Sequence, residues 1–342
     1  MSTESNKTLP APGTPPWLWP HVLSLEAPLV AVLWLAALAH INDLALMPGV
    51  LPGLGLAVWL IYLVDRALDT FGVPAELLSV RHRFYHRFRW PLVWGVIPLG
   101  TGVLAWLALW VVPSGLLAHS LVQVLPIGLY LILYSVTNSK ARRYLLQAGI
   151  LLLLFFINAL PIPFNVRLII SGLIAAGAML MFSFRWHEQV EKLFRKEVAA
   201  GMLFAFGCTT WTRFHTLGSD GADNWMELIF LSLLFVSNLA LITVREDQPD
   251  SSPRAHGTVR SSFIVTLLCL AAILTEHLPT RLLPLCLATL AGLIGLEILW
   301  WKRHQISVEA FRVWADIVVA LPAVVLLLLP ESGPTQAVAC YL

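Results

Sequence analysis

The sequence predicts an all-α polytopic membrane protein, and three observations carry this prediction. Of the 342 residues, 58% are hydrophobic and only 12% are charged, against about 25% charged residues in an ordinary soluble domain. The mean hydropathy is +0.77, and long apolar runs alternate with short charged segments. Backbone in hydrocarbon must satisfy its own hydrogen bonds, so we expect the apolar runs to form a bundle of helices and exclude soluble, disordered and fibrous classes.

The chain divides into a polar, Pro-rich N-terminal tail at residues 1–24 and a single transmembrane helical domain at residues 25–342. A signal peptide would place a cationic start and an apolar core in this tail, so we expect no cleavage. The net charge of +2 is too small, and the basic residues are too scattered, to indicate a nucleic-acid partner. The four cysteines show no metal-binding spacing, so we interpret them as small apolar residues.

Eleven apolar runs approach the length of about 20 residues that a helix needs to cross a bilayer. The second and seventh are the shortest. The predicted spans are 26–47, 49–64, 91–112, 115–136, 144–161, 166–184, 197–213, 226–244, 260–278, 281–301 and 311–330.

The positive-inside rule supports this count independently. With the N-terminus inside and the C-terminus outside, the inner segments carry all but three of the 22 basic residues. The outer segments carry Arg167, Arg213 and Arg281. A wrong number of spans would disrupt the alternation from the point of the error onward.

The second span ends in an acidic pair, Asp65 and Asp69, with Arg66 between them. Residues four apart share one face of a helix, and like charges at that spacing repel each other. A divalent cation between the carboxylates reverses the sign, and Mg²⁺ prefers oxygen ligands. The alternative is that Arg66 and nearby basic residues simply neutralise two aspartates at the membrane surface.

The eighth span contains Asn238 and leads into a second acidic cluster at the same membrane face, made by Glu246, Asp247 and Asp250. Pro249 is expected to break the helix there. A solvated inner loop is the alternative interpretation of this cluster. Lys196 lies at the inner end of the seventh span. It either pairs with an anion near the two clusters or is simply one of the basic residues that the positive-inside rule places on the inner side.

These motifs resemble the UbiA-type membrane prenyltransferases. The similarity lies in the DxxxD helix end at residues 64–69, the Lys-led small-residue helix at 195–201 and the acidic cluster at 245–250. The resemblance implies a cytoplasmic site in which two acidic motifs hold Mg²⁺, and Mg²⁺ binds the diphosphate of an isoprenyl diphosphate. The allylic carbon–oxygen bond then ionises, and an acceptor attacks the cation.

The chain also departs from that family pattern. The family has nine spans and a first motif NDxxDxxxD, whereas here Ile61 and Tyr62 occupy the opening positions and Glu246 opens the second motif. Two additional helices between the motifs explain eleven spans; the pair at 115–136 and 144–161 is one choice, and the sequence leaves open which two are additional. The basic stretch that contains Arg81 and Arg83 supplies diphosphate contacts or anchors the loop on anionic lipid headgroups.

We therefore expect Mg²⁺-dependent transfer of an isoprenyl group from a polyprenyl diphosphate to an unidentified lipid-like acceptor. Asp65, Asp69, Glu246, Asp247 and Asp250 would bind metal, and Arg66, Lys196, Arg81 and Arg83 would contact the diphosphate. The absence of organelle targeting favours a bacterial inner membrane.

Two alternatives remain open. One is a catalytically degenerate family relative that binds lipid or a partner. The other is a small-solute transporter that uses Asp43, Glu297 and Asp316, which the sequence places within the first, tenth and eleventh spans. These polar residues also suit hydrogen bonds between helices.

Overall fold

The computed structural model describes residues 19–70, 80–135, 144–151, 154, 171–172, 195–215, 222–247 and 253–330. The described part of the chain is helical and contains no strand. Seven of its helices are long and apolar enough to cross a membrane. These features indicate a polytopic helical membrane protein, as the sequence predicts.

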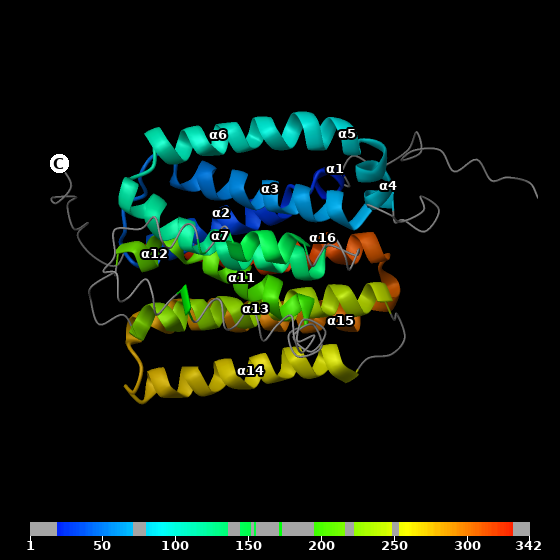
Figure 1. The fold of residues 1–342 in the computed structure, drawn as a ribbon. Helices are drawn as coiled ribbons and strands as arrows, with labels where there is room; N and C mark the ends of the chain where they lie inside the picture. Colours follow the sequence, from blue (N-terminus) through cyan, green and yellow to red (C-terminus); the bar gives the residue numbers. More distant parts are fainter. Residues whose placement is uncertain are drawn as a thin grey trace, which may run out of the picture.

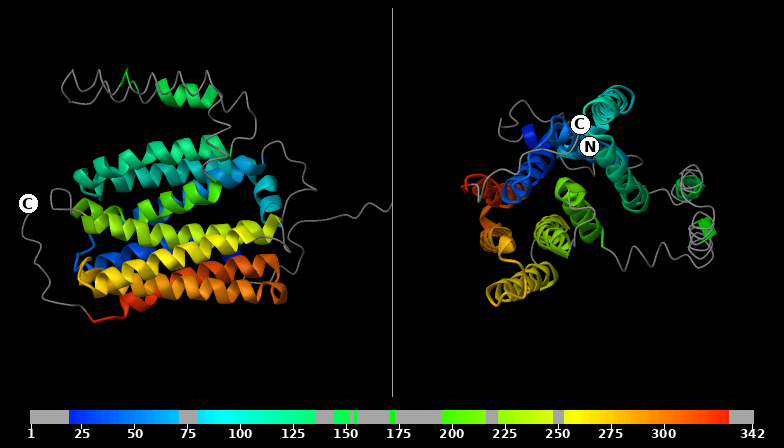
Figure 2. Two further views of the ribbon diagram at one scale, coloured as in Figure 1. Left: turned by 90° about the horizontal axis from the view of Figure 1, so that it is seen from below. Right: turned by 90° about the vertical axis from the view of Figure 1, so that its left-hand side faces the viewer.

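The long helices lie side by side, with α6 and α14 at opposite edges of the bundle (Figures 1 and 2). The membrane-length helical segments are Val50–Thr70 (α3), Arg89–Trp110 (ending in α6, Ile97–Trp110), Ser114–Tyr134 (α7), Trp225–Glu246 within α13 (Ala222–Asp247), Gly257–Leu274 within α14 (Pro253–Leu274), Thr280–Trp301 (mostly α15, Leu283–Trp301) and Val308–Leu327 (α16). The shorter elements are α1 (Trp19–Val22), α2 (Glu26–Ile41), α4 (Val80–Arg87), α5 (Arg89–Pro91), α11 (Lys196–Cys208) and α12 (Thr210–His215).

Three predicted spans need corrected boundaries. The first ends at Ile41, because the Asn42 side chain donates to the Leu38 carbonyl at 2.8 Å and Asp43 turns the backbone with a φ of +52°. Asp43 therefore lies in the turn after α2 and not inside a span. The second span continues to Thr70, so both of its aspartates are helical. The seventh is divided into α11 and α12 at Thr209.

Half of the predicted span at 144–161, and nearly all of the span at 166–184, lies outside the described residues. The span expected at 115–136 is α7.

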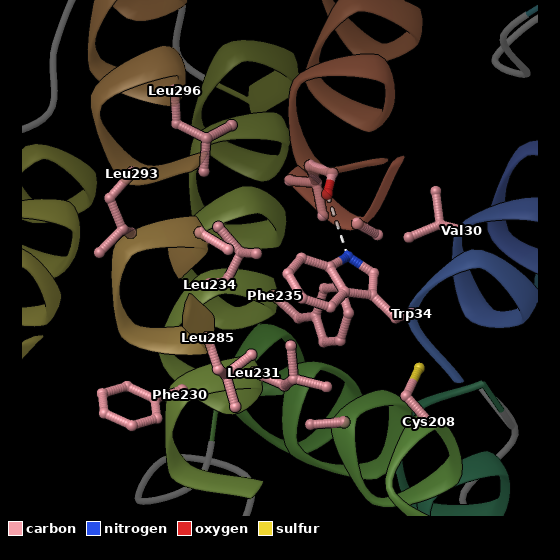
Figure 3. Close-up of a cluster of buried hydrophobic side chains, with 14 of the residues drawn as sticks. Val30, Trp34, Cys208, Phe230, Leu231, Leu234, Phe235, Leu285, Leu293 and Leu296 are labelled. Carbon is pink, nitrogen blue, oxygen red and sulfur yellow. Dashed lines mark hydrogen bonds between the residues drawn. The ribbon is translucent and has the colours of Figure 1, made fainter. Parts of the chain in front are cut away.

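The core of the bundle forms where α2, α11, α13, α15 and α16 meet (Figure 3). Trp34 is fully buried there, and its indole N–H donates to the Val319 carbonyl at 3.0 Å. Its ring also packs edge-on against Phe235, with centroids 6.3 Å apart. Farther along α2, His40 Nε2 lies 2.8 Å from the carbonyl oxygen of Leu329, two residues after the end of α16. The helices α2 and α16 therefore run parallel.

Gly201 sets the close approach of α11 to α13. A Cβ on Gly201 would lie 2.7 Å from the backbone nitrogen of Val236 and 2.9 Å from its Cα. Small residues let helix backbones approach closely in membranes, and the crowding here is against backbone, which no rotamer change relieves.

We expect Gly201→Ala to lower the free energy of unfolding by about 1–3 kcal/mol, the usual cost of overpacking. Thermal unfolding of purified protein in detergent measures this effect. Gly257→Ala is the matched control, since a Cβ there meets nothing within 4 Å and alanine is the better helix former. Equal melting temperatures for the two variants would contradict the close approach of α11 and α13.

Candidate functional site

A cavity of about 960 Å³ lies between α2, α3, α6, α7, α11, α13 and α16. This volume is at the upper end of the range of about 300–1,000 Å³ that is typical of small-molecule sites. Its lining positions on α3 run from Val50 to Asp69, which is about 29 Å of helix at about 1.5 Å per residue. The cavity therefore extends along most of one membrane-length helix.

Charged side chains gather at one end of this cavity, where α3, α7 and α13 end and α11 and α16 begin. We call this the ionic end. It comprises Asp65, Arg66, Asp69, Lys196, Glu246, Arg312 and Asp316. Most of the wall between this end and the opposite end is apolar, with Leu54, Val58, Leu104, Ile127 and Leu203 among its residues.

Asp65 is the most enclosed carboxylate of the ionic end and is only 6% exposed. Its Oδ1 accepts a hydrogen bond from the hydroxyl of Ser135, just beyond the end of α7. The ammonium of Lys196 lies 3.6 Å from the same oxygen, and the Arg66 guanidinium lies 3.8 Å from Oδ2. Asp65 is therefore contacted from α3, α11 and the end of α7.

Asp69 contacts the same two cations. Arg66 Nη1 donates to Asp69 Oδ2 at 3.3 Å, and Lys196 Nζ lies 3.8 Å from Oδ1. The four-residue spacing thus brings both carboxylates to one cavity wall, as the sequence predicts. The Lys196 ammonium is therefore a cationic partner that the Asp65 and Asp69 carboxylates share.

The second acidic cluster contributes Glu246 to the same cavity. Glu246 is paired with Arg312 of α16, and one turn later Asp316 accepts a hydrogen bond from Asn238 Nδ2 at 3.1 Å. Asn238 is buried behind Asp316 and does not line the cavity. The sequence predicts that the ends of α3, at residues 65–69, and of α13, at residue 246, lie at one membrane face. Both helix ends line this cavity.

Several predicted site residues lie outside what the structure describes. The side chains of Asp247, Arg81 and Arg83 belong to this group, although their backbone is helical, and so does the whole of Asp250. Asp43 is described and does not line the cavity.

The acids of the transporter alternative do not form one cluster, because Asp43 lies far from Asp316. Asp316 lines the cavity, whereas Asp43 and Glu297 do not. Asp43 follows the end of α2, which lies beside Leu329, and Leu329 is about 20 Å along the α16 axis from Asp316. Asp316 forms the predicted hydrogen bond between helices instead.

Arg312 was missed as a site residue, and so were Ser135 and the cavity role of Asp316. The signal for the pair on α16 was present, because Arg312 and Asp316 have the same four-residue spacing near a span end as Asp65 and Asp69. Ser135 carries no comparable signal, since one serine after an apolar run is unremarkable in sequence.

The cavity lining carries an excess of negative charge among the described residues. Besides the four carboxylates of the ionic end, Glu26 and Glu197 line the cavity, against the three cations Arg66, Lys196 and Arg312. Of these two further carboxylates, Glu26 is paired with His21 Nδ1 at 2.7 Å. Buried charge of one sign is costly unless it is compensated. The lining therefore favours a bound cation.

No family model matches this chain, and neither a curated protein nor a solved structure matches it. The functional argument accordingly rests on the cavity and on the residues that line it.

Proposed function

We propose that the protein transfers an isoprenyl group from a polyprenyl diphosphate to a lipid-like acceptor, with Mg²⁺ and at the cytoplasmic face. The observation that carries this proposal is the cavity itself, which has a cluster of carboxylates and cations at one end and a long apolar wall beyond it. Such a shape suits an amphiphile with a charged head and a hydrocarbon tail. An isoprenyl diphosphate is a ligand of this kind.

The donor set fits Mg²⁺. This ion is usually held by one or two carboxylates together with substrate phosphates, and it seldom has a cage made only of protein. Asp65 and Asp69 already converge on one cation, and Glu246 lines the same cavity. Asp247, the last residue of α13, and Asp250 complete the proposed ligand set. Bound Mg²⁺ would neutralise the charge of the diphosphate.

The cationic side chains have a separate role in the proposal. Arg66, Lys196 and Arg312 line the cavity, where they stabilise the negative charge that develops on a departing diphosphate. Arginine also binds phosphate oxygens in a bidentate manner, so Arg81 and Arg83 of α4 are further diphosphate contacts.

The apolar wall would hold the prenyl tail. The aromatic rings of Tyr62, Tyr130 and Phe204 line the cavity, and an aromatic face attracts a cation. These rings are therefore suited to stabilise an allylic cation formed when the carbon–oxygen bond breaks. The pair Phe155 and Phe156, a further lining candidate from the sequence, lies outside the described residues.

The finer topology belongs to the same proposal. We infer eleven spans around a UbiA-like bundle, with the N-terminus inside, the C-terminus outside and the bacterial inner membrane as the location. In that arrangement the ionic end faces the cytoplasm, where a soluble supply of diphosphate and Mg²⁺ is available.

The test is binding and turnover of farnesyl diphosphate by the purified protein in lipid nanodiscs. We expect binding in Mg²⁺, loss of binding in EDTA and weak binding of farnesol, which lacks the charged head. Release of inorganic diphosphate in the presence of a membrane lipid extract then reports transfer. Equal binding of farnesyl diphosphate and farnesol in Mg²⁺ would overturn the proposal.

A catalytically degenerate relative is the second candidate, and one observation favours it. Arg66 and Lys196 already balance the charges of Asp65 and Asp69, so the pair is stable without metal. This candidate predicts that farnesyl diphosphate binds in Mg²⁺ without release of inorganic diphosphate from any fraction of the lipid extract.

A further inference from the structure

The turn between α4 and the membrane segment that ends in α6 carries two arginines. We call this turn the basic turn, and it consists of Arg87, Phe88, Arg89 and Trp90. No acidic residue occurs between Glu76 and Glu188 in the sequence. Within the part of the chain that the structure describes, neither arginine forms an ion pair. The positive charge of the basic turn is therefore left without a compensating carboxylate from its own stretch of the chain.

Each arginine of the basic turn lies next to an aromatic ring. The Arg87 guanidinium is 5.8 Å from the centroid of the Phe88 ring, and the Arg89 guanidinium is 5.6 Å from that of the Trp90 ring. Arg87, Phe88 and Trp90 are exposed, and Arg89 is partly exposed. The basic turn thus presents alternating cationic and aromatic groups at the surface of the bundle.

Tryptophans at the two ends of the following membrane segment indicate how deep the basic turn lies. Trp90 and Trp110 are separated by about 30 Å at 1.5 Å per residue, which equals the thickness of the hydrocarbon core, also about 30 Å. Both are exposed, by 57% and 72%, and tryptophan is enriched at both boundaries between membrane and water. With Trp90 at one boundary, Arg87 and Arg89 lie just outside the hydrocarbon, at the level of the lipid phosphates.

The other side of α4 holds the basic turn against the bundle. Tyr85 is 1% exposed, and its hydroxyl oxygen lies 2.9 Å from that of Ser24. Phe84 packs edge-on against Tyr85 and also against Phe88, with ring centroids 5.5 and 4.9 Å apart. Figure 1 shows α4 and α5 at the end of the bundle where α3 ends. The basic turn is therefore fixed at the same membrane face as the ionic end.

We propose that the basic turn binds the headgroup of an anionic phospholipid in the membrane leaflet at this face. The guanidinium groups donate to the phosphate oxygens, which arginine binds in a bidentate manner. Trp90 packs against the glycerol and the upper acyl chain, because its ring has an apolar body and a polar N–H. None of the four residues lines the cavity, so this lipid site does not depend on the proposed isoprenyl transfer.

Lipid titration of the full-length protein in detergent micelles, followed by native mass spectrometry, tests the site. The probes are phosphatidylglycerol, which is anionic, and phosphatidylcholine, whose phosphate is balanced by choline. We expect phosphatidylglycerol to bind more tightly. Arg89→Gln should weaken this binding about fivefold, since a basic residue near an anionic membrane surface contributes about 1 kcal/mol. The double variant Arg87→Gln/Arg89→Gln should weaken it about 25-fold.

Arg260→Gln is the matched control, because it removes one positive charge at the same predicted face. Arg260 is an exposed residue of α14, and its sequence neighbours are Val259 and Ser261 instead of aromatic residues. We expect its affinity for phosphatidylglycerol to stay within twofold of the unaltered protein. If the double variant fails to fold, the single variants and the comparison of the two lipids on the unaltered protein still decide.

Fluorescence quenching locates the bound lipid. In nanodiscs of phosphatidylcholine that contain a small fraction of phosphatidylglycerol brominated near the headgroup, we expect contact quenching of Trp90. Trp90→Phe should therefore remove a larger share of the quenched signal than Trp106→Phe, because Trp106 is 54% exposed but lies four turns farther along the segment. Equal shares in the two variants would place the lipid elsewhere and overturn the site.

Three binding results would also overturn the proposal. Equal affinity for the two lipids would show that the charge of the headgroup is not recognised. Equal losses in Arg89→Gln and Arg260→Gln would assign the preference to the diffuse positive charge of the whole face. Glycerophosphoglycerol that bound as tightly as the intact lipid would make the ligand a soluble phosphate ester. None of these results affects the binding of farnesyl diphosphate in Mg²⁺, which tests the proposed function separately.

Discussion

Asp65→Asn is expected to reduce Mg²⁺-dependent diphosphate release by at least about 100-fold, since removing one preorganised electrostatic group costs about 10²–10³ in rate. The substitution keeps the side-chain size and removes the negative charge that Lys196 and Arg66 approach at 3.6 and 3.8 Å. With one carboxylate left on this face of α3, the apparent affinity for Mg²⁺ should also fall. A Mg²⁺ titration of farnesyl diphosphate binding and of diphosphate release measures both effects.

Glu309→Gln is the matched control for this variant. Glu309 is in the first turn of α16, near the same membrane face, and does not line the cavity. Asp65→Asn also removes a negative charge that compensates the partly buried Arg66 and Lys196, which can lower stability. The melting temperature of the variant must therefore be measured, and its activity normalised to the amount of folded protein. Activity within about threefold of the unaltered protein would make Asp65 a purely structural member of the network.

Trp34→Ala is expected to have the largest effect on stability, about 3 kcal/mol. Trp or Phe to Ala in a soluble core costs about 3–5 kcal/mol. We take the low end because lipid is as apolar as the core, so the substitution loses packing and one hydrogen bond but little hydrophobic transfer free energy. Trp34 is fully buried and joins α2 to α16 through the Val319 carbonyl. Its loss opens a cavity where α2, α13 and α16 meet (Figure 3).

Trp34→Phe separates the hydrogen bond from the packing. Phenylalanine fills most of the space and removes the bond to Val319, so we expect a loss of about 1 kcal/mol, the usual net contribution of one hydrogen bond. Unfolding in a denaturing detergent, followed by circular dichroism, compares the two variants. Similar losses for both variants would contradict the packing argument.

The sequence predicted which groups lie at the same membrane face. The apolar runs and the alternation of basic residues predict that Asp65, Lys196 and Glu246 share one face, because helix length and the inside-positive bias act along the membrane normal. The helical period then places Asp65 and Asp69 on one side of α3. The structure confirms that these residues line a common cavity.

Local backbone chemistry was harder to predict. The first span looks continuous to residue 47 in hydropathy, but Asn42 binds back to the Leu38 carbonyl and Asp43 turns the chain. Side-chain competition for backbone groups ends the helix there. The Thr209 hydroxyl, between α11 and α12, likewise bonds back to the Ala205 carbonyl.

Only the tertiary structure decided which helices meet. In a soluble helix the apolar stripe identifies the buried face, whereas lipid and protein core are equally apolar, so the hydrophobic pattern does not show which side of a membrane helix faces its neighbours. The close approach at Gly201, the pairing of Arg312 with Glu246 and the linkage of Gln123 to Thr210 depend on that choice of neighbours. The sequence alone thus determined the helical membrane class and the acidic motifs, and helix packing decided the cavity and its ionic end.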